Sequence, residues 1–351
     1  MIILGIETSC DETAAAVVQD GTRMLSNVVS SSLDLHRAYG GVVPEIAARS
    51  HIEHILPVID QALTDADCTW DDIDAIAVTC GPGLIGSLLI GVLTARTLAI
   101  AKNKPLLAIN HVQAHVYANF ITDTNLPNYS LNKTVPEFPL LALIVSGGHS
   151  QLVLFESHAS YKLLGQTRDD AVGEAFDKVA KITGLPYPGG PSIAAAAALG
   201  NPASIKLPVA KLDNPYDFSF SGLKTAVLRV AQTLVGQDYT FASSQLPDVL
   251  SGQQKYDLAA SFQHTAVKTL VNATVHAAKE FSPKSVVVAG GVAANSELRR
   301  QLDGALPAKP IYTDIKLCTD NAAMIASAAY FIGDKCLADP YSLSPDANLK
   351  M

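Results

Sequence analysis

Two histidines stand four residues apart in the segment NHVQAHVYANF, at His111 and His115. On a helix this spacing puts both imidazoles on one face about one turn apart, which suits two neighbouring ligands of one metal ion. A structural or surface histidine pair is an equally good interpretation of the spacing alone. Val112 and Gln113 leave no glutamate for an HExxH motif, so a zinc protease would lack its general base.

A third metal ligand has to come from elsewhere in the chain, and Asp320 in the segment CTDNAAMIA is the best candidate. It stands where a helix is expected to begin, so the alternative is that its carboxylate only caps that helix. His51 and His54 also share a helix face, but Arg49 and Glu53 flank them. We interpret this second pair as a solvated face and not as another metal site.

Small-residue turns at 146–148 (SGG) and 290–291 (GG) allow consecutive backbone N–H groups to face an anion. Glycine also serves in ordinary tight turns, which is the alternative for each of them. Together with the polar turn at 8–13, however, they predict a cleft for a nucleotide or an acyl phosphate. The chain contains neither GxxxxGKS nor GxxxxGKT, which excludes a P-loop.

The elements that must position these residues form two similar halves. The first half reads as three strands, an amphipathic helix, a strand and an apolar helix, expected over 2–6, 14–18, 24–29, 52–63, 73–78 and 84–101. The second half repeats a strand, a small-residue turn and a strand over 140–155, and a strand, a glycine turn and a helix from 285 onward. Residues 121–138 and 236–254 show no periodicity and are expected to be loops.

The halves differ in length, since 139 residues separate Leu4 from Leu143 whereas 210 separate Ile76 from Val286. An insertion in the second half accounts for the difference, and we place it at the largely helical residues 169–255. We therefore expect an α/β fold of two duplicated lobes with the site between them, at the carboxyl ends of the strands. The expected lobes are an N-terminal lobe over 1–110, on which a C-terminal helix over 320–351 packs, and a C-terminal lobe over 111–319.

The composition is that of a globular protein: 351 residues, 48% hydrophobic and 17% charged, which excludes fibrous and disordered classes. The five cysteines are scattered and form no CxxC, so neither a disulfide framework nor a cysteine zinc site is expected. The first eight residues do not resemble a signal peptide. Arg96 interrupts the apolar stretch 84–101, which we interpret as a core helix and not as a membrane span. The sequence thus predicts a cytoplasmic protein.

Charge is unevenly distributed along the chain. Residues 1–110 carry 6 basic and 13 acidic residues, a net −7, whereas residues 111–351 carry 19 and 20, a net −1. A polyanionic partner should therefore avoid the first segment and prefer the second. The candidates for phosphate contacts are Lys178, Lys181, Arg299 and Arg300.

Eight motifs occur in one order along almost the whole chain: GIETSCDET, HVQAH, LIVSGGHSQL, GEAFDKVAK, YPGGPSI, DFSFSGLKT, VAGGVAANSELR and TDNAAMIA. Together they resemble the tRNA N6-adenosine threonylcarbamoyltransferase family, which comprises bacterial TsaD and its archaeal, eukaryotic and organellar relatives. The resemblance implies two RNase H-like lobes of the actin, sugar-kinase and heat-shock chaperone fold, in agreement with the duplicated halves.

The resemblance also implies site residues. One divalent metal ion, iron or zinc, would be bound by His111, His115 and Asp320. The threonylcarbamoyl-adenylate would be held by Ile144, Val145, Ser146, Gly147, Gly148, Asp177, Gly190 and Asn295. Functionally important acidic positions of the family correspond to Asp11, Glu12 and Glu174. For Glu174 and Asp177 the alternative is a salt-bridged helix, because Lys178 and Lys181 follow them by four residues.

The function implied by the resemblance is transfer of the threonylcarbamoyl group from threonylcarbamoyl-AMP to the N6 amine of adenosine 37 in ANN-decoding tRNAs, with release of AMP. The implied partners are tRNA, the adenylate, a TsaB-like paralogue and a TsaE-like ATPase, without a membrane. The alternatives are an ATP-dependent sugar or acyl kinase of the same fold, which would need carboxylate-bound magnesium, a metallopeptidase, and a non-catalytic scaffold lacking the metal ligands.

Overall fold

The computed structural model describes residues 1–351, and the chain divides into two compact units. Unit 1 comprises residues 1–137, 155–161 and 311–351, and unit 2 comprises residues 138–154 and 162–310. The lobe bounds expected from the sequence stay a prediction. In the structure, the segment that carries the histidine pair belongs to unit 1.

Unit 1 is built on a seven-stranded mixed sheet with the order β12-β5-β4-β1-β2-β3-β6. Its strands are β1 (Ile2–Glu7), β2 (Glu12–Gln19), β3 (Arg23–Ser31), β4 (Ala75–Gly81), β5 (Leu106–Asn110), β6 (Asp123–Thr124) and β12 (Leu337–Ala338). The strands expected over 2–6 and 14–18, on either side of the polar turn at 8–13, are confirmed as an antiparallel hairpin of β1 and β2, and β4 and β5 continue the sheet in parallel with β1. The carboxyl ends of β1, β4 and β5 therefore lie at one edge of the sheet.

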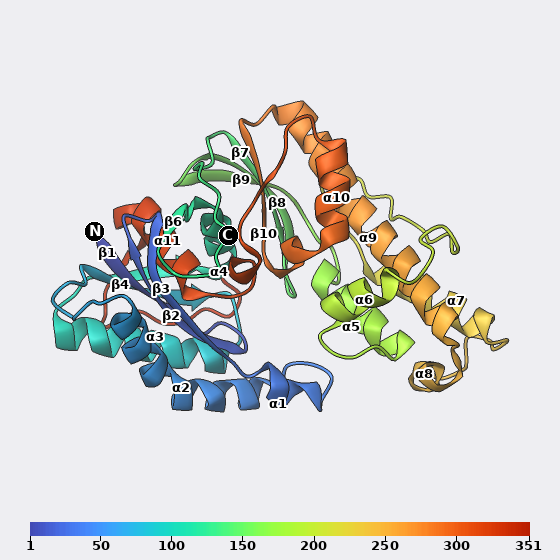
Figure 1. Ribbon diagram of the computed structural model, residues 1–351, viewed down its shortest axis with the longest axis horizontal. Coiled ribbons are helices and arrows are strands. Elements are labelled where there is room, and N and C mark those ends of the chain that lie inside the picture. Colours follow the sequence, from blue (N-terminus) through green and yellow to red (C-terminus); the bar gives the residue numbers. More distant parts are fainter. The chain divides into compact units, whose positions relative to one another are not determined.

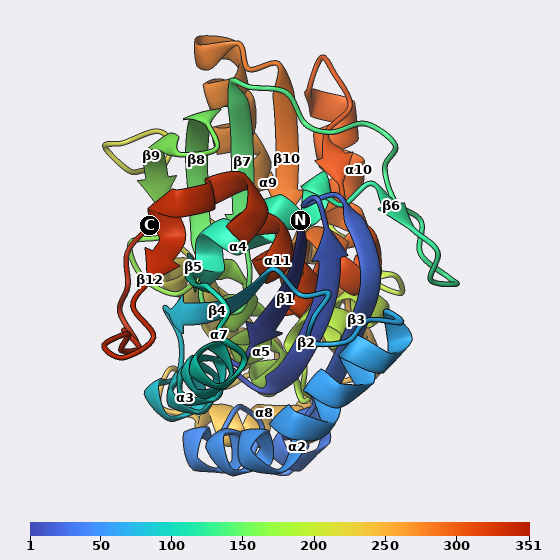
Figure 2. The same ribbon diagram turned by 90° about the vertical axis from the view of Figure 1, so that its left-hand side faces the viewer.

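Helices cover both faces of this sheet (Figures 1 and 2). They are α1 (Leu33–Arg37), α2 (Pro44–Asp65), α3 (Ile85–Lys102), α4 (His111–Tyr117) and α11 (Ala322–Ile332), with short 3-10 turns at Ala118–Phe120, Ile315–Leu317 and Gly333–Cys336. On one face, α2 and α3 pack against β2 and β4 and enclose the main apolar core of unit 1. On the other face α11 crosses β1 so closely that a side chain at Gly5 would collide with the backbone of Ala322.

The apolar stripe predicted for α2 only partly faces the core. Ile55 and Ile59 are buried, at 4% and 2% exposure, and each contributes about 2 kcal/mol by leaving water. Ile52 and Leu56, in contrast, are 62% and 57% exposed. The prediction of the helix is confirmed, but the prediction that these two residues belong to its buried face is wrong, because α2 turns its Ala47, Ile55 and Ala62 side toward the sheet.

The apolar helix α3 is long and hydrophobic enough to cross a membrane by length and composition alone. In the structure it packs against β4 and α2 through Leu88 and Val92, which are fully buried. The prediction of a core helix is thus confirmed for this face. On the opposite face Leu89 and Leu93 are exposed.

Unit 2 contains most of a second, five-stranded sheet, in which β10, β7, β8 and β9 are consecutive neighbours. The strands of this sheet are β7 (Leu140–Val145), β8 (Ser150–Ser157), β9 (Ser160–Gln166), β10 (Ser285–Ala289) and the short β11 (Ile311–Tyr312). Since β7 and β10 are parallel, their carboxyl ends bring the SGG turn at 146–148 close to the GG turn at 290–291. The predicted repeat of strand and small-residue turn is confirmed.

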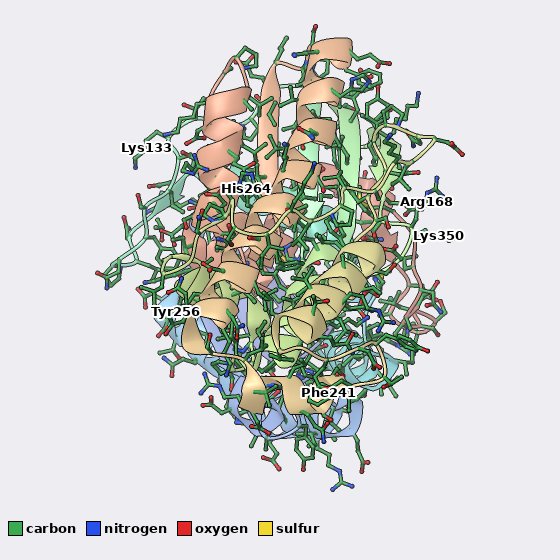
Figure 3. All side chains as sticks on the ribbon, turned by 90° about the vertical axis from the view of Figure 1, so that its right-hand side faces the viewer. Lys133, Arg168, Phe241, Tyr256, His264 and Lys350 are labelled. Atoms are coloured by element: carbon green, nitrogen blue, oxygen red, sulfur yellow. The ribbon has the colours of Figure 1, made fainter.

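Helices make up the rest of unit 2, and the 30-residue α9 is the longest of them (Figure 3). They are α5 (Val172–Thr183), α6 (Gly189–Ala197), α7 (Ser221–Leu234), α8 (Leu246–Val249), α9 (Gly252–Phe281) and α10 (Ser296–Ala305), with 3-10 turns at Ser243–Gln245 and Gly291–Ala294. The prediction of a loop throughout 236–254 is therefore wrong, because residues 243–249 form two short helical turns. Ser251 and Gln254 close a capping box that fixes the start of α9.

The C-terminal segment is helical for only a short stretch. The helix expected over 320–351 is confined to α11, and from Asp339 the chain runs over unit 1 without regular structure. Arg96 of α3 holds this tail by donating hydrogen bonds to the carbonyls of Pro340, Tyr341 and Leu343 at 2.6, 2.7 and 3.1 Å. The charge that interrupts the apolar sequence of α3 thus has a structural partner.

Candidate metal centre and substrate site

The histidine pair owes its position to the cap of α4. This helix follows β5 directly, and the Asn110 side chain accepts hydrogen bonds from the backbone N–H groups of Val112 and Gln113 at 2.9 and 3.1 Å. His111 and His115 then lie on one helix face with ring centroids 4.7 Å apart. They are only 6% and 2% exposed, so the interpretation as a surface pair is excluded.

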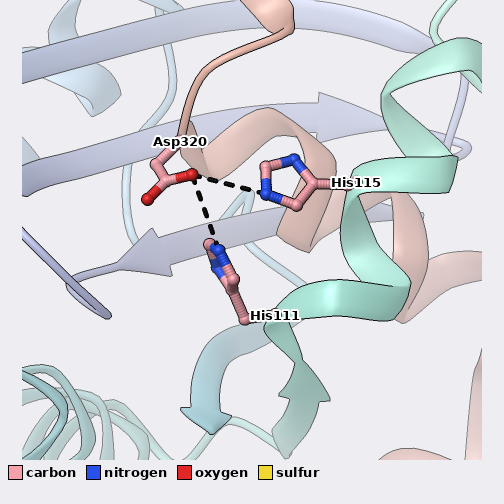
Figure 4. A group of neighbouring side chains, drawn as sticks. All are labelled: His111, His115 and Asp320. Atoms are coloured by element: carbon pink, nitrogen blue, oxygen red, sulfur yellow. Dashed lines mark ion pairs between the residues drawn. The ribbon is translucent and has the colours of Figure 1, made fainter. Parts of the chain in front are cut away.

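Asp320 completes a group of three possible ligands (Figure 4). Its Oδ1 atom lies 3.5 Å from Nε2 of His111 and 3.4 Å from Nε2 of His115. The alternative in which Asp320 caps the following helix is wrong. The N-cap of α11 is Asn321, whose side chain accepts from the N–H of Met324 at 3.1 Å.

The donor set fits a transition metal. The three ligand atoms lie within 4.8 Å of one another, and two imidazoles with one carboxylate suit iron or zinc. Both ring nitrogens of His115 are buried without a hydrogen-bond partner. A buried imidazole normally satisfies its polar atoms, so a metal bound at Nε2 would supply the interaction that the protein leaves out.

Two carboxylates dominate the electrostatics at His111. Burial lowers the pKa of this histidine, but Asp320 and Glu7 outweigh burial and raise it to about 9. Burial likewise works to raise the pKa of Glu7, and the charge and hydrogen bond of His111 bring it below its usual value. In the absence of metal, the two residues therefore form a buried ion pair with Nδ1 3.0 Å from Oε2.

Sequence reasoning missed Glu7, although it lies in the first motif. The residue ends β1 and is completely buried, and a carboxylate on the last residue of an apolar strand was the available signal. Its fully buried neighbour Thr79 on β4 donates a hydrogen bond to Glu7 Oε2 at 2.6 Å.

The acidic residue Asp11 ends the turn between β1 and β2, and Glu12 is the first residue of β2; both belong to unit 1 like the histidines. Burial, followed by the like charges of Asp320 and Asp11, raises the pKa of Glu12 well above its usual value. A carboxylate with a raised pKa is a stronger base than an ordinary carboxylate.

Glu174 shows the salt-bridged arrangement that was its alternative. Its carboxylate is 2.8 Å from Nζ of Lys178, which also contacts Asp170 at 2.7 Å. Both side chains of the Glu174–Lys178 pair are more than one-third exposed, so the pair contributes little to stability. The structure thus adds no support for a catalytic Glu174.

The SGG turn lies against the start of α5 and leaves space beside its two glycines. The carbonyls of Ser146 and Gly147 accept hydrogen bonds from the first N–H groups of α5, at Gly173 and Glu174. The Cα atoms of Gly147 and Gly148 face open space, so a ligand can approach their backbone. Ile144 and Val145, which precede the turn, are completely buried on β7.

The remaining predicted substrate residues also lie in unit 2. Gly190, in the first turn of α6, has open space at its Cα. Asn295 caps α10 by accepting from the N–H of Leu298 at 3.0 Å, and its amide donates to Gln263 at 2.9 Å. Asp177 accepts from the N–H of Gly189 at 2.7 Å, and burial raises its pKa.

The second histidine pair does not form a solvated face, so that interpretation is wrong for His51. This side chain is completely buried, with Nδ1 2.8 Å from the Thr13 hydroxyl and Nε2 3.0 Å from the Cys10 carbonyl. His54 is partly exposed and bonds only to Ser50 of its own helix. His51 thus connects α2 to the β1–β2 turn and to the start of β2, and both of its ring nitrogens are occupied by hydrogen bonds.

Intramolecular contacts engage three of the four cations predicted to contact phosphates. Arg300 makes a two-pronged contact with Glu297, both of its bonds at 2.8 Å, and Arg300 leads the interactions that hold the pKa of Glu297 at about 2. Arg299 donates to the Ala293 carbonyl, and Lys178 is paired as described. Lys181 is exposed.

Comparisons with known proteins identify the family of this chain. The family model described as "TsaD: tRNA N6-adenosine threonylcarbamoyltransferase" matches residues 23–327. A protein of that name from Thermomicrobium roseum is 50% identical over 100% of this chain and 97% of its own length. Those from Symbiobacterium thermophilum and Bacillus licheniformis are 52% and 45% identical, covering 94% and 100% of this chain and 91% and 97% of their own.

Among solved structures, HypF from T. kodakarensis has a TM-score of 0.59 at 13% identity, covering 94% of this chain and 46% of its own. A full-length HypF in a phosphate- and nucleotide-bound form has a TM-score of 0.56 at 13% identity, covering the same shares. At this identity the likeness concerns the fold alone. The α/β fold with two mixed sheets is the one expected for the actin, sugar-kinase and heat-shock chaperone class.

Proposed function

Because this chain belongs to the tRNA N6-adenosine threonylcarbamoyltransferase family, we propose that its donor is threonylcarbamoyl-AMP and its acceptor the N6 amine of adenosine 37 in ANN-decoding tRNAs. The chain is a threonylcarbamoyltransferase that acts on tRNA. Membership in this family replaces the kinase, metallopeptidase and scaffold alternatives. The assignment of each step to particular residues is our proposal.

His111, His115 and Asp320 hold one iron or zinc ion in this proposal. The observation that carries it is the buried His115, whose two ring nitrogens have no hydrogen-bond partner although the other two ligand atoms lie beside its Nε2. A bound ion of this kind supplies Lewis acidity that anchors the donor and neutralises charge developing during transfer. The three ligands all belong to unit 1, so that unit alone can bind the metal.

The nucleotide portion of the donor binds to unit 2. The backbone N–H groups of Gly147 and Gly148 orient the phosphate, in the manner of other glycine-rich anion sites. Asp177 accepts hydrogen bonds from hydroxyl groups of the donor, and Asn295 accepts from or donates to them. Alternatively, the two side chains fix the backbone segments that contact the donor. Gly190 leaves room for the ligand beside the first turn of α6.

An acidic residue of the β1–β2 turn takes the proton. The exocyclic amine of adenine is a poor nucleophile, so loss of its proton has to accompany attack on the carbamoyl carbon. Asp11 and Glu12 are the candidates, and the raised pKa of Glu12 suits a proton acceptor. Asp11→Asn and Glu12→Gln, assayed separately, identify which of the two is needed.

The test is a transfer assay with synthetic threonylcarbamoyl-AMP and unmodified tRNA, read by mass spectrometry of the nucleosides. We expect His115→Ala to lose its bound metal and roughly 90% or more of the transfer activity, since it lacks one of three protein ligands. The matched control is His54→Ala, which removes a histidine that bonds only within its own helix. Full activity in metal-free His115→Ala would overturn the assignment.

Partner proteins belong to this proposal as well. The exposed residues Ile52 and Leu56 of α2 and Leu89 and Leu93 of α3 lie on two helices that pack side by side (Figure 2). Such an apolar surface is characteristic of a protein interface. We assign it to a TsaB-like paralogue, with a TsaE-like ATPase as a further component. Leu89→Glu combined with Leu93→Glu should abolish co-elution with the paralogue, and unchanged co-elution would contradict this assignment.

The cytoplasm is the proposed location, because the tRNA substrate is found there and α3 uses its apolar face in the core of unit 1. The exposed apolar residues of α3 are then accounted for by a protein partner.

A further inference from the structure

Glu7 is a completely buried carboxylate at the end of a strand whose other residues are apolar. Removing a carboxylate from water is costly unless charged and hydrogen-bonding partners surround it. A buried carboxylate at this position is therefore expected to serve a function that offsets this cost.

Both carboxylate oxygens of Glu7 have partners within unit 1. Oε1 accepts a hydrogen bond from the backbone N–H of Ser9. Oε2 accepts one from the Thr79 hydroxyl at 2.6 Å and lies 3.0 Å from Nδ1 of His111. Since Ser9 follows β1 and Thr79 stands on the adjacent β4, the orientation of the carboxylate is set by the sheet itself.

This arrangement determines which nitrogen of His111 carries the proton. A carboxylate that accepts at Nδ1 keeps the proton on that atom in the neutral ring, so the lone pair is on Nε2. Nε2 is the atom that faces Asp320, at 3.5 Å. Histidines that bind metals commonly donate their other N–H group to a carboxylate, which fixes the ring and makes it a stronger ligand.

The two histidines of the pair differ in this respect. Nδ1 of His111 contacts the Glu7 carboxylate and lies 3.1 Å from the Ser9 hydroxyl. His115 has no hydrogen-bond partner at either ring nitrogen. The protein therefore orients the ring of His111 by hydrogen bonds to Nδ1, whereas the ring of His115 is held by packing, including the ring of His111, and by its contact with Asp320.

We propose that Glu7 is a positioning residue of the metal centre, which fixes the ring and the tautomer of His111 and is itself held by Thr79. The inference rests on the proposed metal site and adds a residue to it. A purely structural Glu7, connecting β1 to β4 through Thr79, is the competing explanation. It predicts changes in stability that are independent of metal affinity.

Cobalt(II) is a suitable probe, because its visible absorption reports the ligand geometry and its affinity can be measured against a chromophoric chelator. We expect Glu7→Gln to bind Co²⁺ about 10- to 100-fold more weakly than the wild type and to show an altered spectrum. The amide has nearly the shape of the carboxylate but can turn its N–H group toward Nδ1, which favours the wrong tautomer. Wild-type affinity and spectrum in Glu7→Gln would overturn the inference.

A pair of variants at Thr79 decides the question if Glu7→Gln does not fold. Thr79→Val removes the hydroxyl at nearly constant shape, and Thr79→Ser keeps it. We expect Co²⁺ affinity to fall several-fold in the valine variant and to stay at the wild-type value in the serine variant. Equal affinity in the two variants would contradict the proposed role.

Thr13→Val is the matched control, because Thr13 stands on the same sheet and the variant removes the hydroxyl that bonds to another buried histidine, His51 of α2. It should lower the melting temperature and leave Co²⁺ affinity unchanged, whereas a loss as large as that in Thr79→Val would indicate a general effect of packing and overturn the inference. Failure of the wild type to bind Co²⁺ would overturn the proposed metal site as well. Normal binding by the wild type and by every Glu7 variant would overturn the positioning role alone.

Discussion

The carboxylate of Asp177 holds the N–H group of Gly189 at 2.7 Å and so connects the middle of α5 to the first turn of α6. A side chain at Gly189 would lie 2.5 Å from the Cα atom of Asp177, so the two helices approach closely at this point. Gly190, a predicted substrate residue, is the next residue in the chain.

This relationship predicts separate effects on substrate and metal. Asp177→Ala should weaken binding of a non-reactive adenylate analogue about tenfold, by loss of a direct contact or by release of the turn at Gly190. Asp177→Asn, which can still accept from Gly189, should retain more of the affinity. Calorimetric titration measures both. Metal content should stay at the wild-type value in both variants, and its loss in parallel with adenylate binding would point to a general structural role.

The two histidine ligands should differ in what their removal costs the metal-free protein. His111→Ala leaves the buried Glu7 without its charged partner, although Thr79 and Ser9 still donate to it. His115→Ala removes a side chain without hydrogen bonds. We therefore expect His111→Ala to lose roughly 2 kcal/mol more of the free energy of unfolding than His115→Ala. Urea titration of the metal-free proteins tests this, and equal losses would show that Glu7 does not depend on His111.

Lys181 is the best remaining candidate for a tRNA contact in α5 and α10. Lys181→Glu should raise the KM for tRNA and reduce the slope of log affinity against log salt by about 1, while adenylate binding is retained. Lys335→Glu, an equal charge change at an exposed lysine of unit 1, is the control. The double variant Arg299→Glu and Arg300→Glu should also raise the KM for tRNA and reduce the salt dependence, but it breaks the contact between Arg300 and Glu297 as well. An unchanged tRNA titration in both sets would exclude these helices from the footprint.

The buried His51 predicts a pH dependence of stability. Burial lowers its pKa below the usual 6.5, so the unfolded chain takes up a proton at a higher pH than the folded protein does. Its contribution to stability is therefore complete above about pH 6.5 and declines as the pH falls from there toward the folded-state pKa. Unfolding titrations between pH 7.5 and about 5 should show a smaller decline in His51→Gln than in the wild type. His276→Gln, at an exposed position, should reproduce the wild-type curve; the same flattening there would remove His51 as its source.

Arg96 should stabilise unit 1 through the C-terminal tail. Arg96→Met keeps the apolar stem of the side chain and removes three hydrogen bonds to the tail, at a cost of about 3 kcal/mol. Hydrogen exchange should become faster in residues 339–350, where the tail also bonds to Cys80 and Asn110. Arg49→Met loses only an exposed ion pair with Glu45 and should change stability by less than about 1 kcal/mol. Unaltered exchange in the tail would contradict this role of Arg96.

The sequence by itself determined the features that depend on neighbours along the chain. Two apolar runs on either side of a polar turn predicted β1 and β2, and the glycine turns after β7 and β10 were recognisable in the same way. The four-residue spacing of His111 and His115 placed both on one helix face, because helical periodicity relates side chains one turn apart. The ordered motifs predicted the family, which the comparisons confirm.

Only the tertiary structure decided which partners such residues meet. Asp320 reaches the histidines because α11 packs beside α4, and one residue of difference gives the helix cap to Asn321 and leaves Asp320 beside the imidazoles. The sequence pattern for α2 could not distinguish the buried Ile55 from the exposed Leu56, because the breadth of a buried face depends on the sheet beneath it. Glu7 and His111 are 104 positions apart in the chain. No local rule connects them, because their contact exists only once β1, β4 and β5 are aligned in one sheet.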